Sequence, residues 1–212
     1  IVYGVLDTAE RTQFVRIMKG YLDPETNALE LADIADSIYY GSDLIVRMTE
    51  QSTGDRFDLK RVDGDTLTPP IKREEGTFAT SPNILYQLNR SLKKGEVYRL
   101  YIENPSTGKV IQASTPTLGK FDITFPPDPR NFPYRLNFYG KSSGEEITWN
   151  TPEFGKTYDV QITFNYLEWG FNESKSNAER KSVTFTTSRG VTSNTTSGDE
   201  SITTNIEGDA FF

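Results

Sequence analysis

The sequence of 212 residues contains no histidine and no cysteine. The absence of histidine excludes Ser-His-Asp and Cys-His nucleophile arrangements and removes the commonest metal ligand. The absence of cysteine excludes disulfides, thiol chemistry, thiolate zinc sites and iron–sulfur clusters. We therefore expect no catalytic nucleophile of these types, no metal site and no cofactor.

The chain also lacks a long apolar segment and an excess of positive charge. No apolar run approaches the roughly 20 residues that a bilayer-spanning helix needs. The net charge is −7, from 23 basic and 30 acidic residues, which argues against a nucleic-acid groove. Nothing matches a P-loop or a GxGxxG turn between a strand and a helix. These absences predict an acidic, non-catalytic globular protein that does not bind nucleic acid.

What the sequence does contain is alternation with a period of two. From Tyr158 to Tyr166, five apolar residues alternate with four polar ones, which is typical of a half-buried antiparallel strand. Shorter stretches repeat this pattern at residues 44–48, 98–102, 121–125, 134–138 and 183–185. Turn-forming residues separate these stretches, so we predict an all-β chain of antiparallel β-sandwiches.

One segment, residues 24–36, has a helical period instead. Its alanine, leucine and isoleucine residues recur at helical spacing, and Pro24 suits the first turn of a helix. We predict a short helical insertion between strands of the first domain. It is expected to cover the end of a sheet, and a lid over a binding site is the alternative.

Composition also indicates how the chain is divided. A predicted hairpin of Val97–Glu103 with Lys109–Ala113 closes a first β-sandwich domain of residues 1–117. A smaller sandwich is expected over residues 118–188. The chain then becomes rich in serine, threonine and asparagine, so we predict a flexible tail over residues 189–212.

Carboxylates are the only abundant acid–base candidates. The adjacent pairs Glu74-Glu75 and Glu145-Glu146 are expected to be surface charge, since neighbours in a strand point to opposite faces and neighbours in a loop are solvated. Asp63-Gly64-Asp65 resembles part of a calcium loop, but the later ligands are missing. We interpret it as a turn and assign no catalytic residue.

Aromatic residues supply the candidate ligand site. Trp149 is expected in the core of the second sandwich. Counting from Tyr158, inward side chains occupy even positions, which leaves Trp169 pointing outward. Exposed aromatics beside a loop stack on sugar rings or anchor a protein partner, so the candidate ligand-binding residues are Trp169, Phe171 and Tyr166. The alternative is that Trp169 and Phe171 pack against the first domain or cap the sandwich end.

Several short motifs resemble domains of unknown function in Bacteroidetes cell-envelope lipoproteins. The motifs are Tyr3-Gly4-Val5-Leu6-Asp7 with Phe14-Val15-Arg16-Ile17, Gly95–Leu100 with Ala113–Thr117, and Trp149-Asn150-Thr151-Pro152 with Gly155–Tyr158 and Phe164-Asn165-Tyr166. The resemblance covers most of residues 1–187 and marks no catalytic residue. It implies tandem sandwich modules of the immunoglobulin or fibronectin type.

The resemblance also implies a location and a modification. Such lipoproteins have a signal peptide and a lipid-attached cysteine upstream, which implies outer-membrane anchoring and exposure at the surface or to the periplasm. Here a signal peptide is expected to be absent or already removed, and the anchor to lie outside this chain. Members are O-glycosylated at Asp-Ser/Thr followed by an aliphatic residue, a pattern found at Thr8, Ser37 and Thr66.

Three functions remain open from the sequence. The first is a non-catalytic envelope-lipoprotein fragment that binds a glycan or an envelope protein partner, or serves as a scaffold. The second is an adhesin-like or fimbria-like subunit that assembles by strand pairing, supported by the apolar ends at residues 1–6 and 210–212. The third is a carboxylate-dependent hydrolase, which requires two acidic residues converging in a cleft.

Overall fold

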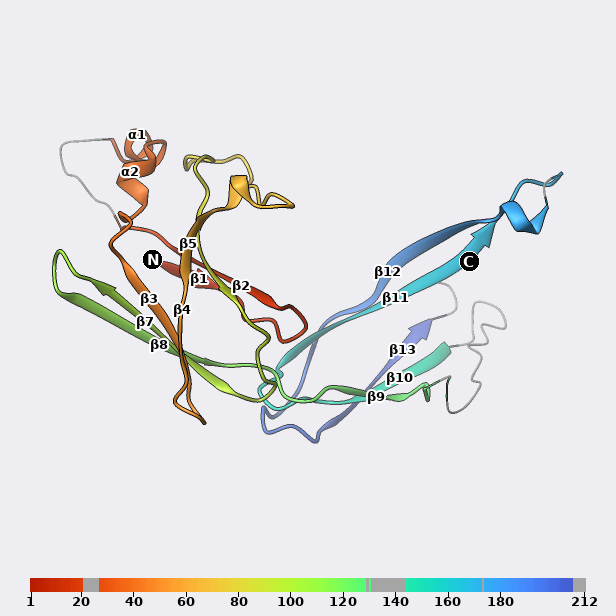
Figure 1. Ribbon diagram of the computed structural model, residues 1–212. Coiled ribbons are helices and arrows are strands. Elements are labelled where there is room, and N and C mark those ends of the chain that lie inside the picture. Colours follow the sequence, from red (N-terminus) through yellow and green to blue (C-terminus); the bar gives the residue numbers. More distant parts are fainter. Residues whose placement is uncertain (21–26, 129, 131–143, 173, 208–212) are drawn as a thin grey trace. The chain divides into compact units, whose positions relative to one another are not determined.

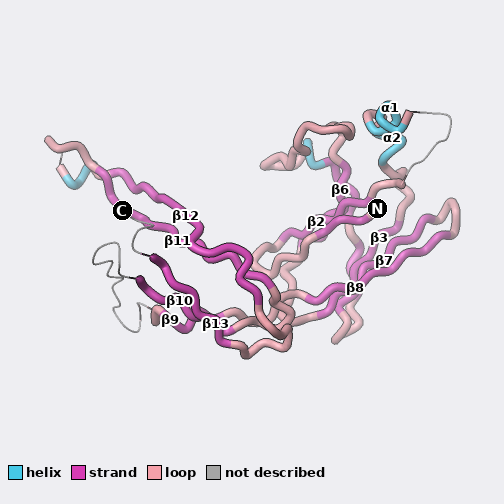
Figure 2. The backbone as a smooth tube through the Cα atoms, turned by 180° about the vertical axis from the view of Figure 1, so that it is seen from behind, coloured by secondary structure: helices cyan, strands magenta, loops and turns pink. Residues whose placement is uncertain are grey.

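A computed structural model describes residues 1–20, 27–128, 130, 144–172 and 174–207. Strands hold 48% of the chain and helices 8%, so the predicted all-β class is confirmed. Figure 2 shows that helix is confined to short segments. The chain divides into two compact units, Ile1–Thr117 and Leu118–Phe212, which run from red to green and from green to blue in Figure 1.

The first unit contains two antiparallel sheets of four strands. The spatial order of the first sheet is β1 (Val2–Gly4), β2 (Thr12–Ile17), β6 (Ile84–Asn89) and β5 (Lys60–Asp63). The order of the second is β4 (Arg56–Asp58), β3 (Ile45–Glu50), β7 (Val97–Asn104) and β8 (Lys109–Pro116). The pairing of β7 with β8 confirms the predicted hairpin.

A single apolar core joins these two sheets. In β2 and β3 every second side chain is buried, which places Val15 and Met48 in the core. Tyr86 of β6 and Tyr98 of β7 pack in the same cluster. Burying one large apolar side chain contributes about 1.5–3 kcal/mol. Two antiparallel sheets around one core are consistent with the predicted β-sandwich class.

The helical insertion differs in detail from the prediction. It consists of α1 (Ala28–Ala32) and α2 (Ala35–Ile38), and residues 24–26 of the predicted helix lie outside the described part. The Asn27 side chain caps α1 by accepting a hydrogen bond from the Leu29 amide at 3.0 Å, and the predicted helix start at Pro24 lies outside the described residues. Ile34 is extended and separates the helices. Ile38 is buried in a second apolar cluster with Ile84 of β6.

The second unit contains a sheet of three strands and a long hairpin. The sheet has the order β13 (Ser201–Glu207), β10 (Gly144–Asn150) and β9 (Asp122–Phe125). The hairpin consists of β11 (Thr157–Glu168) and β12 (Glu179–Thr192), with the 3-10 turn η2 (Lys175–Asn177) between them. Trp149 is buried with its ring centroid 5.6 Å from that of Tyr158, as expected for a core residue.

The predicted flexible tail over residues 189–212 is wrong for its described part. β12 continues to Thr192, and β13 pairs with β10 over seven residues. Backbone hydrogen bonds do not depend on apolar composition, and threonine suits strands. Ile206 supplies the buried anchor of β13. The predicted strand at 134–138 and the apolar end at 210–212 lie outside the described residues.

Candidate functional site

The hairpin of β11 and β12 has two differently packed halves. In the inner half, Ile162 lies with Ile147 and Ile206 around a cavity of about 490 Å³ between the two sheets of the second unit. In the outer half, Phe164 is 58% exposed and its cross-strand neighbour Val183 is 50% exposed. Figure 1 shows β11 and β12 side by side, and no other described strand pairs with them. The outer half is thus an isolated two-stranded ribbon.

A hollow of about 670 Å³ lies at the end of this ribbon, and we call it the tip hollow. Its lining residues come from β11, the segment that follows β11, η2 and β12: Asn165, Tyr166, Leu167, Trp169, Lys175, Arg180, Lys181 and Ser182. This lining contains an aromatic surface, three cationic groups, an amide and a hydroxyl. None of the described lining residues carries a carboxylate.

The strand register places these side chains on two faces of the ribbon. Leu167 pairs with Arg180, so these two side chains share a face. Tyr166 pairs with Lys181 on the opposite face, where the Tyr166 ring stacks on Phe164 at 5.8 Å between centroids. Trp169 follows the end of β11 at Glu168, and Trp169 and Arg180 both line the tip hollow.

The cationic groups of the tip hollow are in different states. Lys181 makes an ion pair with Glu168, and this hydrogen bond raises the pKa of Lys181. Arg180 and Lys175 make no ion pair with any residue that the structure describes. Among the described residues, these two positive charges of the hollow are thus not neutralised by an ion pair.

The structure separates the three aromatic residues selected from the sequence. Trp169, which is 46% exposed, and Tyr166 both line the tip hollow. Phe171 is fully exposed and is not part of the lining. Sequence reasoning missed Arg180 and Lys175, because their position beside Trp169 follows only from the register of β12 and the path of the turn.

The three predicted glycosylation positions differ in their surroundings. Thr66 is exposed at the end of the 3-10 turn η1 (Gly64–Thr66), where its hydroxyl donates to the Asp63 carbonyl oxygen at 2.8 Å. Thr8 is half-buried in the loop before β2. Ser37 is half-buried within α2.

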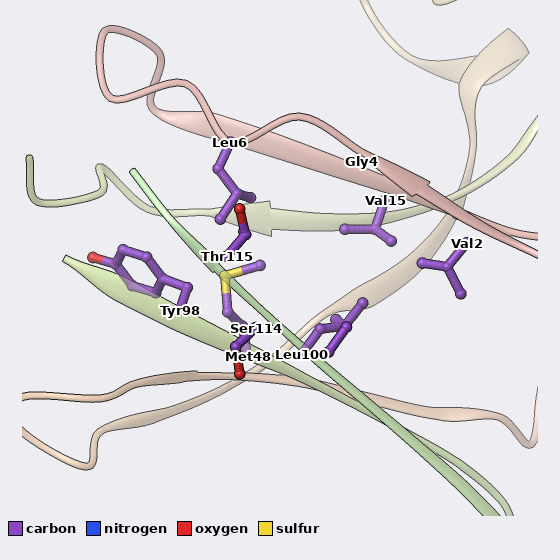
Figure 3. Close-up of a pocket in the computed structure, with 10 residues that line it drawn as sticks. Val2, Gly4, Leu6, Val15, Met48, Tyr98, Leu100, Ser114 and Thr115 are labelled. Carbon is purple, nitrogen blue, oxygen red and sulfur yellow. The ribbon is translucent and has the colours of Figure 1, made fainter. Parts of the chain in front are cut away.

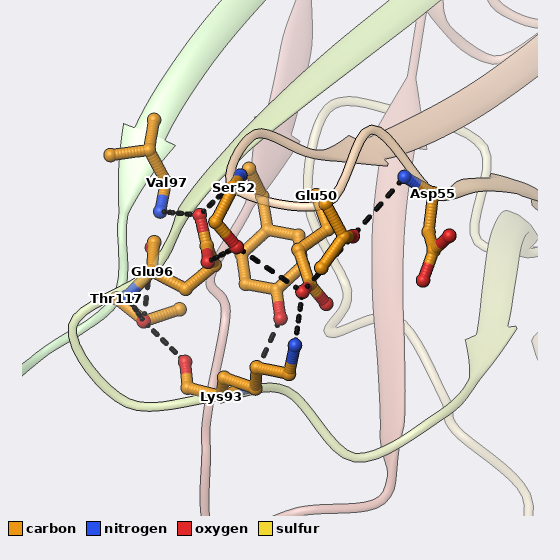
Figure 4. A network of polar contacts seen from close by, with 9 residues as sticks. Glu50, Ser52, Asp55, Lys93, Glu96, Val97 and Thr117 are labelled. Atoms are coloured by element: carbon orange, nitrogen blue, oxygen red, sulfur yellow. Dashed lines mark hydrogen bonds and ion pairs between the residues drawn. The ribbon is translucent and has the colours of Figure 1, made fainter.

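Acidic residues of the first unit converge at a place that the sequence did not indicate. Glu50 at the end of β3 and Glu96 before β7 both accept a hydrogen bond from the Ser52 hydroxyl (Figure 4). Glu50 is 1% exposed and also accepts a hydrogen bond from Lys93. The Thr117 hydroxyl donates to the Lys93 carbonyl oxygen at 2.7 Å.

These hydrogen bonds connect the turn that follows β3 to the loop that precedes β7. The hydrogen bond from Lys93 is the main cause that lowers the pKa of Glu50, and the one from Ser52 is the main cause that lowers the pKa of Glu96. Both groups are thus held as carboxylates by local donors, and the Glu50 carboxylate is buried. The pair has the character of a structural clamp.

The other acidic motifs have ordinary structural settings. Glu74 and Glu75 are exposed, and Glu145 and Glu146 are successive residues of β10. Asp63 forms a turn in which its carboxylate accepts from the Asp65 amide at 3.1 Å. Within the described ranges, no group of three potential metal ligands comes together.

A second hollow, the edge slot, lies in the first unit. It has a volume of about 220 Å³ and is bounded by residues of the edge strands β1 and β8 and of the core. Figure 3 shows Leu6 and Met48 projecting into this slot, with Thr115 of β8 beside them. Among the described strands, β1 and β8 are each paired on one side only, and an apolar opening between two such edges is a setting in which a further strand can bind.

Comparison with known proteins adds no relative: no family model, no curated protein and no solved structure matches this chain. The described helices α1 and α2 are also much too short to cross a membrane.

Proposed function

We propose that this chain is a non-catalytic binding module that contacts a glycan through the tip hollow. The observation that carries the proposal is the half-exposed indole of Trp169 in a hollow that also offers an amide, a hydroxyl and cations. An aromatic face stacks on the apolar face of a sugar ring, and adjacent polar groups orient its hydroxyls. An envelope protein partner is the competing ligand.

Affinity electrophoresis against a panel of soluble polysaccharides tests this proposal. We expect one glycan to retard the protein, and the retardation to disappear in Trp169→Ala with little change in melting temperature. Phe171→Ala is the matched control, because Phe171 is exposed but does not line the hollow. If no glycan retards the wild type, the glycan proposal fails and a protein partner takes its place.

We also propose that the modules are of the immunoglobulin or fibronectin type and that the protein is an envelope lipoprotein anchored at the outer membrane. Antiparallel sheets around a shared core and the sequence motifs described above support this proposal. Fractionation of the source cells with an antibody against this chain tests the location. Recovery in the cytoplasmic fraction would contradict it.

The edge slot favours a second function, assembly by strand pairing with a second copy. The motivating observation is that β1 and β8 lie beside an apolar opening and are edge strands of the sheets that the structure describes. We expect concentration-dependent association in light scattering, and its loss in Thr115→Lys, which places a charge at the slot. A wild-type chain that stays monomeric at high concentration excludes this function.

A further inference from the structure

We propose that the tip hollow is specific for anionic glycans, with Arg180 and Lys175 as the specificity-determining residues. This inference rests on the proposed glycan-binding function and names the chemical class of its ligand. The ligands of this class share a sugar ring that carries an anionic substituent, either a carboxylate or a sulfate group.

The charges of the tip hollow differ from those of the chain as a whole. The chain has a net charge of −7, yet the described residues that line the tip hollow include three cations and no carboxylate. Glu168 neutralises Lys181 at the rim, and Glu168 itself pairs in register with Glu179 at the end of the hairpin. Arg180 and Lys175 remain without an ionic partner among the described residues, so an anionic ligand would supply the missing charge.

Polar side chains lie close to Trp169 in the tip hollow. Leu167 and Arg180 share one face of the ribbon, and Asn165 and Ser182 continue this face along the strands. Trp169 follows the end of β11 and lines the same hollow. A guanidinium binds a planar carboxylate or a sulfate through two parallel hydrogen bonds. A sugar ring stacked on the indole could therefore direct its acidic substituent toward Arg180, while Lys175 contributes a second charge from η2.

Titration calorimetry with two matched pairs of probes tests the inference. The first pair is polygalacturonate and its methyl ester, and the second is dextran sulfate and unmodified dextran. Each pair keeps the sugar backbone and removes the charge, so the pairs distinguish a carboxylate ligand from a sulfate ligand. We expect at least one charged probe to bind more than tenfold more tightly than its neutral counterpart.

Substitutions of single cationic residues distinguish a specific binding site from nonspecific electrostatic attraction of the charged probe to the protein. Arg180→Gln and Lys175→Gln are each expected to weaken binding of the charged probe at least fivefold. Arg189→Gln is the matched control, because Arg189 is an exposed arginine on the same strand but does not line the tip hollow. Equal losses in all three variants would overturn the inference, since they would show nonspecific attraction.

The remaining outcomes distinguish this inference from the proposed function. If neutral and charged probes bind equally well and Trp169→Ala abolishes both, the glycan-binding function stands and the anionic specificity is wrong. If a charged probe binds through Arg180 but Trp169→Ala has no effect, the stacking geometry is wrong. If none of the probes and none of the panel polysaccharides binds, both proposals fail.

Discussion

Glu50 illustrates how a single buried charge depends on residues far away in the sequence. Its carboxylate lies at the end of β3, whereas Lys93 belongs to the loop before β7. The Thr53 hydroxyl adds a hydrogen bond of 3.2 Å to the same oxygen. A buried carboxylate is tolerated only when donors surround it, so the clamp and the burial of Glu50 depend on each other.

We expect Glu50→Gln to lower the free energy of unfolding by about 1–2 kcal/mol. The substitution keeps the shape of the side chain but removes the charge that accepts from Lys93, and the exposure of Lys93 limits the effect. Urea denaturation measures this change. Glu74→Gln is the control, since Glu74 is exposed, and an equal loss there would contradict the explanation.

The clamp also predicts acid sensitivity. Because the pKa values of Glu50 and Glu96 are lower in the folded state than in the unfolded state, their ionised forms stabilise the fold. This contribution is complete above the ordinary glutamate pKa of about 4.3 and is lost as the pH falls through the lowered folded values. Melting temperatures between pH 6 and pH 3 measure it. Glu50→Gln should show a shallower decline than the wild type.

At the scale of elements, the two halves of the β11–β12 hairpin contribute differently to stability. Ile206 of β13 is buried opposite the inner half, whereas Phe164 of the outer half is mostly exposed. Deleting a buried isoleucine side chain removes apolar contacts and leaves a cavity. An exposed ribbon position has few contacts to lose.

We therefore expect Ile206→Ala to lower the free energy of unfolding by about 2–4 kcal/mol. Phe164→Ser should change it by less than about 1 kcal/mol. Chemical denaturation followed by circular dichroism compares the two variants. A large loss in Phe164→Ser would show that the outer half of the hairpin is covered in solution.

Elements could be predicted from the sequence where one face of a strand is apolar. The alternation from Tyr158 to Tyr166 predicts most of β11. Trp149, in another strand, is buried as predicted, and Trp169 is half-exposed. β13 was missed because serine and threonine occupy most of its positions. Pairing with β10 organises this strand, and that pairing is a long-range property.

The candidate site could be predicted only in part for the same reason. Counting along the strand predicts Trp169 outward and Phe164 inward, yet Phe164 is 58% exposed and Trp169 46%, because the outer half of the hairpin is isolated. The presence of Arg180 in the same hollow depends on the register across the hairpin, which the intervening turn sets. The Glu50–Lys93 clamp joins residues 43 positions apart, and no local pattern indicates it.

At the scale of the whole molecule, each unit has its own sheets and its own buried side chains. The core cluster of the first unit draws on β2, β3, β6 and β7, all within Ile1–Thr117. The Glu50 clamp closes within the same range, ending at Thr117. The first unit thus contains the interactions that a stable domain needs.

We expect the fragment of residues 1–117 to fold alone and to unfold in one cooperative transition. Thermal denaturation followed by near-ultraviolet circular dichroism tests this, because the signal reports the packing of Tyr86 and Tyr98 in the core. Full-length protein measured in parallel is the reference. A fragment that keeps strand content but has no near-ultraviolet signal would contradict the expectation.

The isolated outer half of the β11–β12 hairpin has a consequence for how this protein can change under selection. Its side chains add few buried contacts, so substitutions around the tip hollow carry a small stability cost. Residues of the cores lack this freedom. Related chains should therefore diverge most rapidly around Trp169 and Arg180, acquiring different ligands while the sheets beneath them keep the same fold.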